Sequence, residues 1–81
     1  MKLFIGLDLG VNKAAICVLD DNGGTVLQTI VPSEPAQVIA KLSKLSGEIA
    51  LIGFEARPLS EWMYGALRDA GYPVFCIETR H

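Results

Sequence analysis

Apolar residues form short blocks along the chain, and the blocks follow two kinds of spacing. Two longer segments repeat apolar residues at three- and four-residue intervals, which indicates helices with one apolar face. One starts at Ser33-Glu34-Pro35, where Ser33 supplies a capping hydroxyl, and ends near Gly47. The other runs from Pro58 to Gly71. The remaining blocks are continuous or β-branched apolar runs, typical of strands, and they cover residues 2–9, 13–19, 25–31, 48–54 and 73–77.

The order of these elements restricts the topology. Turn residues at 20–24 (Asp-Asp-Asn-Gly-Gly) predict a hairpin, so the first three strands should form an antiparallel meander. A strand-helix-strand unit requires a parallel right-handed crossover, so strand 73–77 should lie parallel to strand 48–54. The most apolar strands, 2–9 and 48–54, are expected side by side at the centre, buried on both faces.

The predicted fold class is therefore α/β and ribonuclease H-like, with a mixed five-stranded sheet in the order 3-2-1-4-5 and two helices. A bare meander with helices packed on one side is the alternative. A later helix that usually covers the second face of such sheets is missing, so the domain is expected to be truncated. Apolar positions on 2–9 and 48–54 would then face water, and a patch of this kind predicts a homo-oligomer or a strand-exchanged dimer.

Composition restricts the class of protein further. The chain has 81 residues, is 51% hydrophobic and 20% charged, and has a net charge of -2. These values predict a single small domain over 1–81 and exclude a disordered or low-complexity chain. Seven Lys+Arg against nine Asp+Glu provide no basic face, so unaided binding of nucleic acid should be weak. The apolar runs are far shorter than the roughly 20 residues that span a bilayer, which predicts a cytoplasmic protein that does not interact with a membrane.

Two further expectations concern packing. Cys17 and Cys76 fall on strands predicted to lie three apart, about 14 Å, whereas a disulfide needs Cα atoms within about 7 Å. Both are therefore predicted to be free thiols. On the second helix, Trp62 and Met63 belong to the apolar stripe and are expected in the core.

Asp8 and Glu55 are the candidate site residues. Asp8 lies near the carboxyl end of a strand predicted to be buried, where a carboxylate is costly unless it is paired or holds a cation. Glu55 follows strand 48–54 at the matching end, and neighbouring strands lie about 4.8 Å apart. Such a pair of hard oxygen ligands suits Mg²⁺ or Mn²⁺. Taken singly, Asp8 could instead cap its turn, and Glu55 could be a solvated residue at a helix start.

Other residues carry weaker signals. Asp20 and Asp21 occupy a hairpin turn, where aspartate is common for backbone reasons. Arg57 and Lys13 could reach a phosphate, although a solvated surface position is the simpler interpretation of each. His81 has no Cys or His near it in sequence and is assigned no role.

Several of these residues recur in one known family. Gly6-Leu7-Asp8-Leu9-Gly10, then Asn12-Lys13, then Gly53-Phe54-Glu55-Ala56 and Pro58-Leu59 resemble the amino-terminal, RuvC-like domain of DEDD-type insertion-sequence transposases, which are relatives of the Piv invertase. The resemblance extends over essentially the whole chain, through the ending at 76–81. Arg57 departs from the small residue often found at its position, and Glu78-Thr79-Arg80 departs from an Asn-Pro type of ending.

The resemblance implies metal-dependent DNA strand cleavage and transfer, that is, DNA transposition and recombination. Asp8 would match the first catalytic aspartate and Glu55 the glutamate, together binding Mg²⁺ or Mn²⁺. In this family two more aspartates and a carboxy-terminal domain follow, so the 81-residue fragment itself is expected to be inactive. DNA, and a structured guide RNA, are the partners implied for the full-length protein.

Three alternatives remain open. An actin-like or sugar-kinase fragment could use the Asp8-Leu9-Gly10 turn to bind ATP phosphates and magnesium. A Holliday-junction resolvase would share the fold and add later acidic residues of its own. A non-catalytic interaction module would keep the fold without the chemistry.

Overall fold

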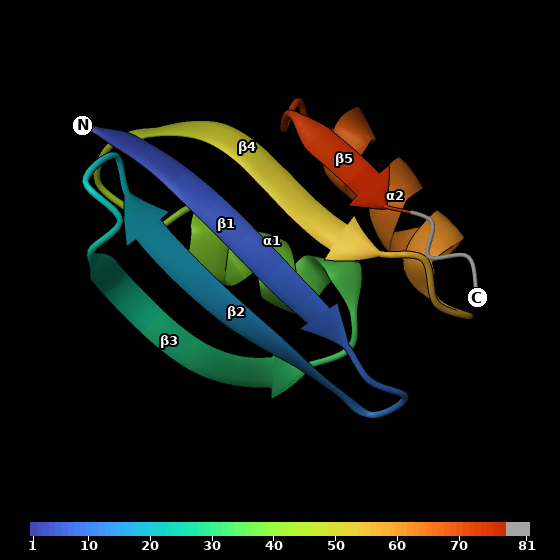
Figure 1. The fold of residues 1–81 in the computed structure, drawn as a ribbon. Coiled ribbons are helices and arrows are strands. Elements are labelled where there is room, and N and C mark those ends of the chain that lie inside the picture. The colour runs from blue at the N-terminus through green and yellow to red at the C-terminus, as the bar shows by residue number, and fades with distance from the viewer. Residues whose placement is uncertain (78–81) are drawn as a thin grey trace.

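A computed structural model describes residues 1–77 and shows a sheet with both helices on one of its faces (Figure 1). The elements in chain order are β1 (Lys2–Leu9), β2 (Lys13–Asp20), β3 (Thr25–Pro32), α1 (Pro35–Leu42), β4 (Glu48–Glu55), α2 (Ser60–Asp69) and β5 (Val74–Ile77). The five strands lie in the order β3-β2-β1-β4-β5. The predicted α/β class, strand order and helix number are confirmed.

Strand directions also agree with the prediction. β1 pairs with β2, and β2 with β3, in antiparallel fashion. β4 is parallel to both β1 and β5. The central β1–β4 register places Gly6 opposite Gly53 and Leu7 opposite Phe54. Segments more than forty residues apart in sequence are thereby brought side by side at the middle of the sheet.

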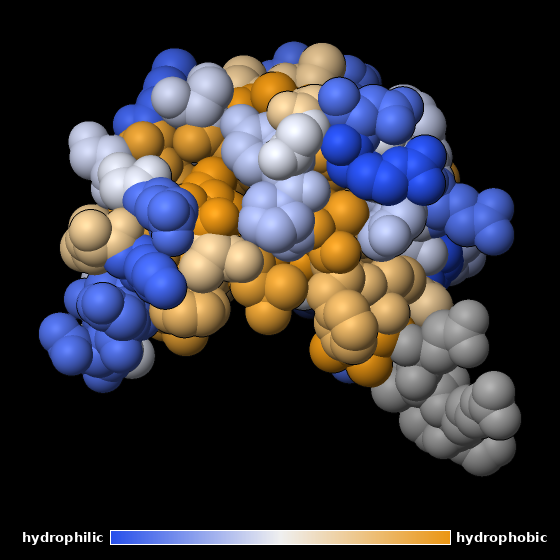
Figure 2. All heavy atoms as spheres, turned by 90° about the horizontal axis from the view of Figure 1, so that it is seen from above, coloured by the Kyte–Doolittle hydropathy of each residue, from blue (hydrophilic) through white to orange (hydrophobic). Residues whose placement is uncertain are grey.

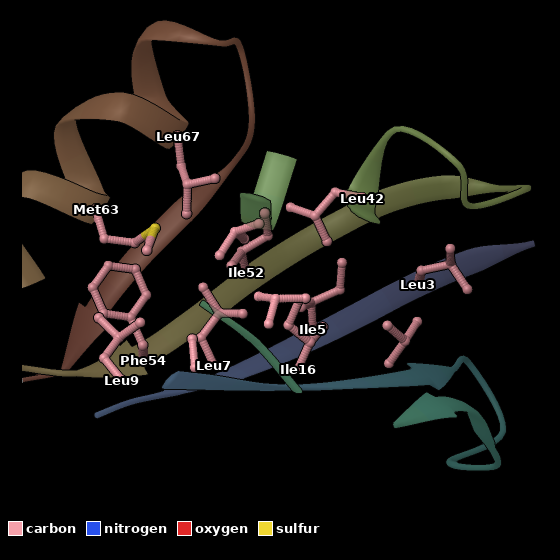
Figure 3. Close-up of a cluster of buried hydrophobic side chains, with 14 residues drawn as sticks. Leu3, Ile5, Leu7, Leu9, Ile16, Leu42, Ile52, Phe54, Met63 and Leu67 are labelled. Carbon is pink, nitrogen blue, oxygen red and sulfur yellow. The ribbon is translucent and has the colours of Figure 1, made fainter. Parts of the chain in front are cut away.

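The core fills the space between the sheet and the two helices (Figure 3). Alternate residues of β1 point into it, because successive side chains of a strand face opposite sides. Helices α1 and α2 supply the opposing layer through residues spaced three or four positions apart. The largest fully buried side chains are Leu3, Ile16, Leu42, Ile52, Met63, Leu67, Val18 and Val38.

The prediction that β1 and β4 are buried on both faces is wrong. Phe4, Gly6 and Asp8 of β1 are exposed, as is Leu51 of β4. Their strands are apolar on both sides, but in residues 1–77 the helices cover one face and leave the other open. We call this uncovered side the open face. The expected exposure of apolar positions on these two strands is thus observed.

Helix details differ from the prediction at three points. Helix α1 ends at Leu42, well before Gly47, and α2 begins at Ser60 instead of Pro58. Trp62 was expected in the core but is 54% exposed. The buried residues of α2 are Ser60, Met63 and Leu67, a narrow stripe at intervals of three and four, and Trp62 lies beside that stripe because successive helical residues are rotated by about 100°.

Both cysteines are free in the described chain, as predicted. Cys17 is on β2 and Cys76 on β5, and two strands, β1 and β4, separate them. Across residues 1–77, neither helix has the length and apolarity needed to cross a membrane.

Candidate functional site

Asp8 and Glu55 lie at the same edge of the sheet. Because β1 and β4 are parallel and Leu7 pairs with Phe54, the next residue along each strand stands at its carboxyl end. Arg57 links the two carboxylates: its Nη2 lies 3.3 Å from Glu55 Oε2 and 3.9 Å from Asp8 Oδ1. Two carboxylates separated by 47 positions of sequence therefore face a single cationic group.

The three charged side chains are open to solvent. Asp8 is 78% exposed, Glu55 55% and Arg57 49%. The expectation that burial makes the Asp8 carboxylate costly is therefore wrong, because the uncovered face of β1 leaves that side chain in water. The case for a site depends on the proximity of the carboxylates and not on desolvation.

Local backbone contacts fix the position of Arg57. Its N–H donates to Ser60 Oγ at 3.1 Å, and the Ser60 hydroxyl donates to the Arg57 carbonyl at 2.7 Å. Ser60 is buried, with 5% of its surface exposed. On the other side, the Ala56 N–H donates to the Ile77 carbonyl at 2.7 Å, and Pro58 restricts Arg57 to extended conformations. The backbone that carries the guanidinium is thus fixed on both sides.

The turn after Asp8 is also tightly built. The Gly10 N–H donates to the Lys13 carbonyl at 2.9 Å, and a Cβ at Gly10 would stand 2.7 Å from that oxygen. The buried Ser33 hydroxyl donates to the Gly10 carbonyl at 2.7 Å. Ser33 was expected to cap α1, but it ties the β1–β2 turn to the end of β3 instead. Ser33 is thus one of the residues that hold the end of β1.

A groove on the open face leads to the carboxylates. Seen along its edge, the molecule is arched and apolar side chains gather on its hollowed side (Figure 2). The groove encloses about 490 Å³, with Asp8, Glu55 and Arg57 among its lining residues. Gly6 and Gly53, which are paired partners, leave its floor without side chains. The apolar residues that line it on the exposed side are Phe4, Leu51 and Ile77.

The weaker candidates lie elsewhere. Asp20 Oδ1 accepts hydrogen bonds from the N–H groups of Asn22 and Gly24, which is the backbone role expected for a turn aspartate. Asp21 is exposed in the same turn, and Lys13 is exposed at the start of β2. His81, and the 78–80 part of the family resemblance, lie outside the described residues.

Sequence reasoning did not identify Ser60 or Ser33 as residues that build this edge of the sheet. For Ser60 a signal exists in the Arg-Pro-Leu-Ser segment, since a hydroxyl three residues after Arg57 can reach its N–H. For Ser33 no local signal exists, because its partner Gly10 is 23 positions away in sequence.

The carboxylate pair fits part of a divalent-metal site. Both are hard oxygen donors of the kind that Mg²⁺ and Mn²⁺ prefer, and ions of this type keep several water or phosphate ligands. Within residues 1–77, no cluster of three or more His, Cys, Asp or Glu is placed to hold a metal. The Arg57 guanidinium occupies the place that a metal ion shared by the two carboxylates would take. The two carboxylates could therefore supply two ligands to such an ion and leave its other ligand positions open.

No protein-family model matches the chain, and no curated protein matches it.

Proposed function

We propose that the chain is the amino-terminal, ribonuclease H-like domain of a DNA transposase or recombinase of the DEDD type, and that Asp8 and Glu55 bind its divalent metal. One observation carries this proposal: the two carboxylates end neighbouring parallel strands at the centre of a 3-2-1-4-5 sheet and face the same cationic group. The family resemblance around Asp8 and Glu55 supports it.

The chemistry proposed is phosphoryl transfer on DNA. When bound, Mg²⁺ or Mn²⁺ activates the attacking oxygen and neutralises charge on the leaving one. Asp8 and Glu55 would supply two of its ligands. Because both side chains are exposed, water and the phosphate backbone of a substrate could supply others.

Two carboxylates are fewer than the four that this class uses. We therefore propose that the 81-residue chain is inactive by itself and that it works as part of a larger protein. Its net charge of -2 is consistent with this proposal, because a domain that binds DNA without other domains needs a basic surface. Contacts with DNA, and with a structured guide RNA, would then depend on other parts of the full-length protein. Metal-dependent nicking of DNA by the purified chain, lost in Asp8→Ala, would contradict the proposed inactivity.

The test is a calorimetric titration of the 81-residue chain with MnCl₂. Wild type should bind one ion, and Asp8→Asn and Glu55→Gln should each weaken binding at least about tenfold, since each removes one of two charged ligands. Asp69→Asn is the matched control, because Asp69 also pairs with an arginine at the surface, 3.5 Å from Arg68 Nη2. Equal binding by wild type and Asp8→Asn, or no binding at all, would remove the metal site and favour a non-catalytic module.

An actin-like ATP-binding function predicts a different result. Such a protein would use the Asp8-Leu9-Gly10 turn against phosphate, yet here the Gly10 N–H already donates to the Lys13 carbonyl. That N–H is therefore not free to bind a phosphate. Thermal stabilisation by Mg²⁺–ATP beyond that by Mg²⁺ alone would support the ATP-binding alternative.

A further inference from the structure

Arg57 occupies the position where a shared cation would stand. Its Nη2 is 3.3 Å from Glu55 Oε2 and 3.9 Å from Asp8 Oδ1, so a single nitrogen reaches both carboxylates. A divalent ion held by the same two residues would need to lie between the same oxygens. The guanidinium and the ion therefore compete for one place.

The position of Arg57 follows from the backbone. Ser60 binds both the N–H and the carbonyl of Arg57, and the Ala56 N–H is bound to the Ile77 carbonyl. Glu55 and Arg57 are two positions apart in extended chain, so their side chains point to the same side. The backbone therefore directs the Arg57 side chain to the side of the sheet that carries the carboxylates, and its guanidinium reaches both of them.

The electrostatic energy of the Asp8–Glu55 pair is lowest when one cation lies next to the two carboxylates, and higher with no cation or with two. Without a cation, the adjacent carboxylates repel each other. With both a guanidinium and a divalent ion, the two positive groups repel at short range. Entry of metal therefore requires the guanidinium to leave.

The structure provides room for that movement. Arg57 also lines a second hollow of about 170 Å³, next to the groove that contains the carboxylates. Its other walls are Leu9, Gly10, Val11, Pro58 and Leu59. Because the Arg57 side chain is half exposed and already lines this hollow, it can turn toward the hollow without displacing a buried residue.

We infer that Arg57 is a built-in counter-cation that neutralises Asp8 and Glu55 in the metal-free protein and competes with a divalent metal for them. The inference rests on the metal site of the proposed function and adds its regulation: the guanidinium weakens metal binding until a ligand draws it away. An anionic substrate group such as a DNA phosphate is the chemical class able to do so, because guanidinium binds phosphate strongly.

The experiment compares Mn²⁺ affinity in Arg57→Gln and in Arg68→Gln by titration of the 81-residue chain with MnCl₂ at low salt. Both substitutions remove one arginine that pairs with a surface carboxylate, but Arg68 and its partner Asp69 are on α2. Arg57→Gln should bind Mn²⁺ at least about tenfold more tightly than wild type, because a unit charge held about 4 Å from a divalent ion in water would weaken binding about thirtyfold and the guanidinium relieves part of this repulsion by moving away. Arg68→Gln should match wild type, and Arg57→Lys, which keeps the charge, should stay within about threefold of it.

The outcomes separate this inference from the proposed function. Tighter binding by Arg57→Gln that disappears in Asp8→Asn/Arg57→Gln supports both. Equal affinity in wild type and Arg57→Gln, with loss in Asp8→Asn, overturns the competition and leaves the metal site standing. Weaker binding by Arg57→Gln also overturns it, since Arg57 would then assist the metal. Absence of binding in wild type and Arg57→Gln alike overturns both.

Discussion

The Ser60 hydroxyl holds Arg57 through two hydrogen bonds, accepting one from its N–H at 3.1 Å and donating one to its carbonyl at 2.7 Å. Ser60 is buried at the start of α2, so the segment that carries the guanidinium is anchored to the interior. The Ser60 hydrogen bonds therefore position the Arg57 backbone, and the ion pairs with Asp8 and Glu55 follow from that position. Exposed ion pairs of this kind contribute little to the free energy of folding.

Ser60→Ala should destabilise the protein by about 1–2 kcal/mol, since it removes two hydrogen bonds and leaves the Arg57 N–H without its partner. Urea unfolding followed by circular dichroism measures this change. Ser43→Ala is the control: the Ser43 hydroxyl donates to the Ala40 carbonyl at an exposed position, and its loss should stay within about 0.5 kcal/mol. Equal effects of the two substitutions would show that the Ser60 contacts do not fix Arg57.

Asp8→Asn should change the free energy of unfolding by less than about 1 kcal/mol. The side chain is 78% exposed and its pairing with Arg57 at 3.9 Å is solvated, so solvent screens most of the interaction. Urea unfolding without metal tests this. A loss above about 2 kcal/mol would mean that Asp8 has a structural role, and that weaker Mn²⁺ binding in this variant reports unfolding.

Gly10→Ala should destabilise the protein by about 1–3 kcal/mol, because its Cβ would meet the Lys13 carbonyl oxygen at 2.7 Å. Gly6→Ala, on the preceding strand β1, is the comparison: across residues 1–77, a Cβ there has no heavy atom within 4 Å. It should be tolerated within about 0.5 kcal/mol. Thermal unfolding of the two variants gives the difference, and a Gly6→Ala that is the more harmful of the two would contradict the described turn.

Self-association through the open face is a further prediction. Leu51 and Phe75 are exposed there by 43% and 55%, and apolar patches of this kind drive association. Sedimentation velocity should show the wild type forming dimers or larger species as concentration rises, and Leu51→Ser/Phe75→Ser should shift it toward monomer. Trp62→Ser is the control, because Trp62 is equally exposed but lies on α2. A wild type that stays monomeric at high concentration would contradict the prediction.

The sequence specified the sheet well because its signals are local. Apolar blocks separated by turn residues such as Asn22 and Gly23 identify strands, and the crossover rule then orders them. The juxtaposition of Asp8 and Glu55 followed from that order. The metal role assigned to the pair stays a prediction.

What the sequence could not supply depends on the surroundings of each residue. The apolar run of β1 does not say whether a second layer covers it, so the exposure of the Asp8 carboxylate was misjudged. Trp62 is close enough to the apolar stripe of α2 to be taken for core, although helix rotation carries it to the surface. Ser33 binds Gly10, and Arg57 reaches Asp8, and both of these partners become neighbours only after folding.

The β2–β3 turn lies at the opposite end of the sheet from the two carboxylates (Figure 1). It is closed by its own residues, with Asp20 accepting from Asn22 and Gly24, and it contributes nothing to the edge that holds Asp8. A fluorescent protein or an affinity handle grafted at this hairpin tip would therefore report on the domain inside a larger assembly while leaving the opposite rim unobstructed.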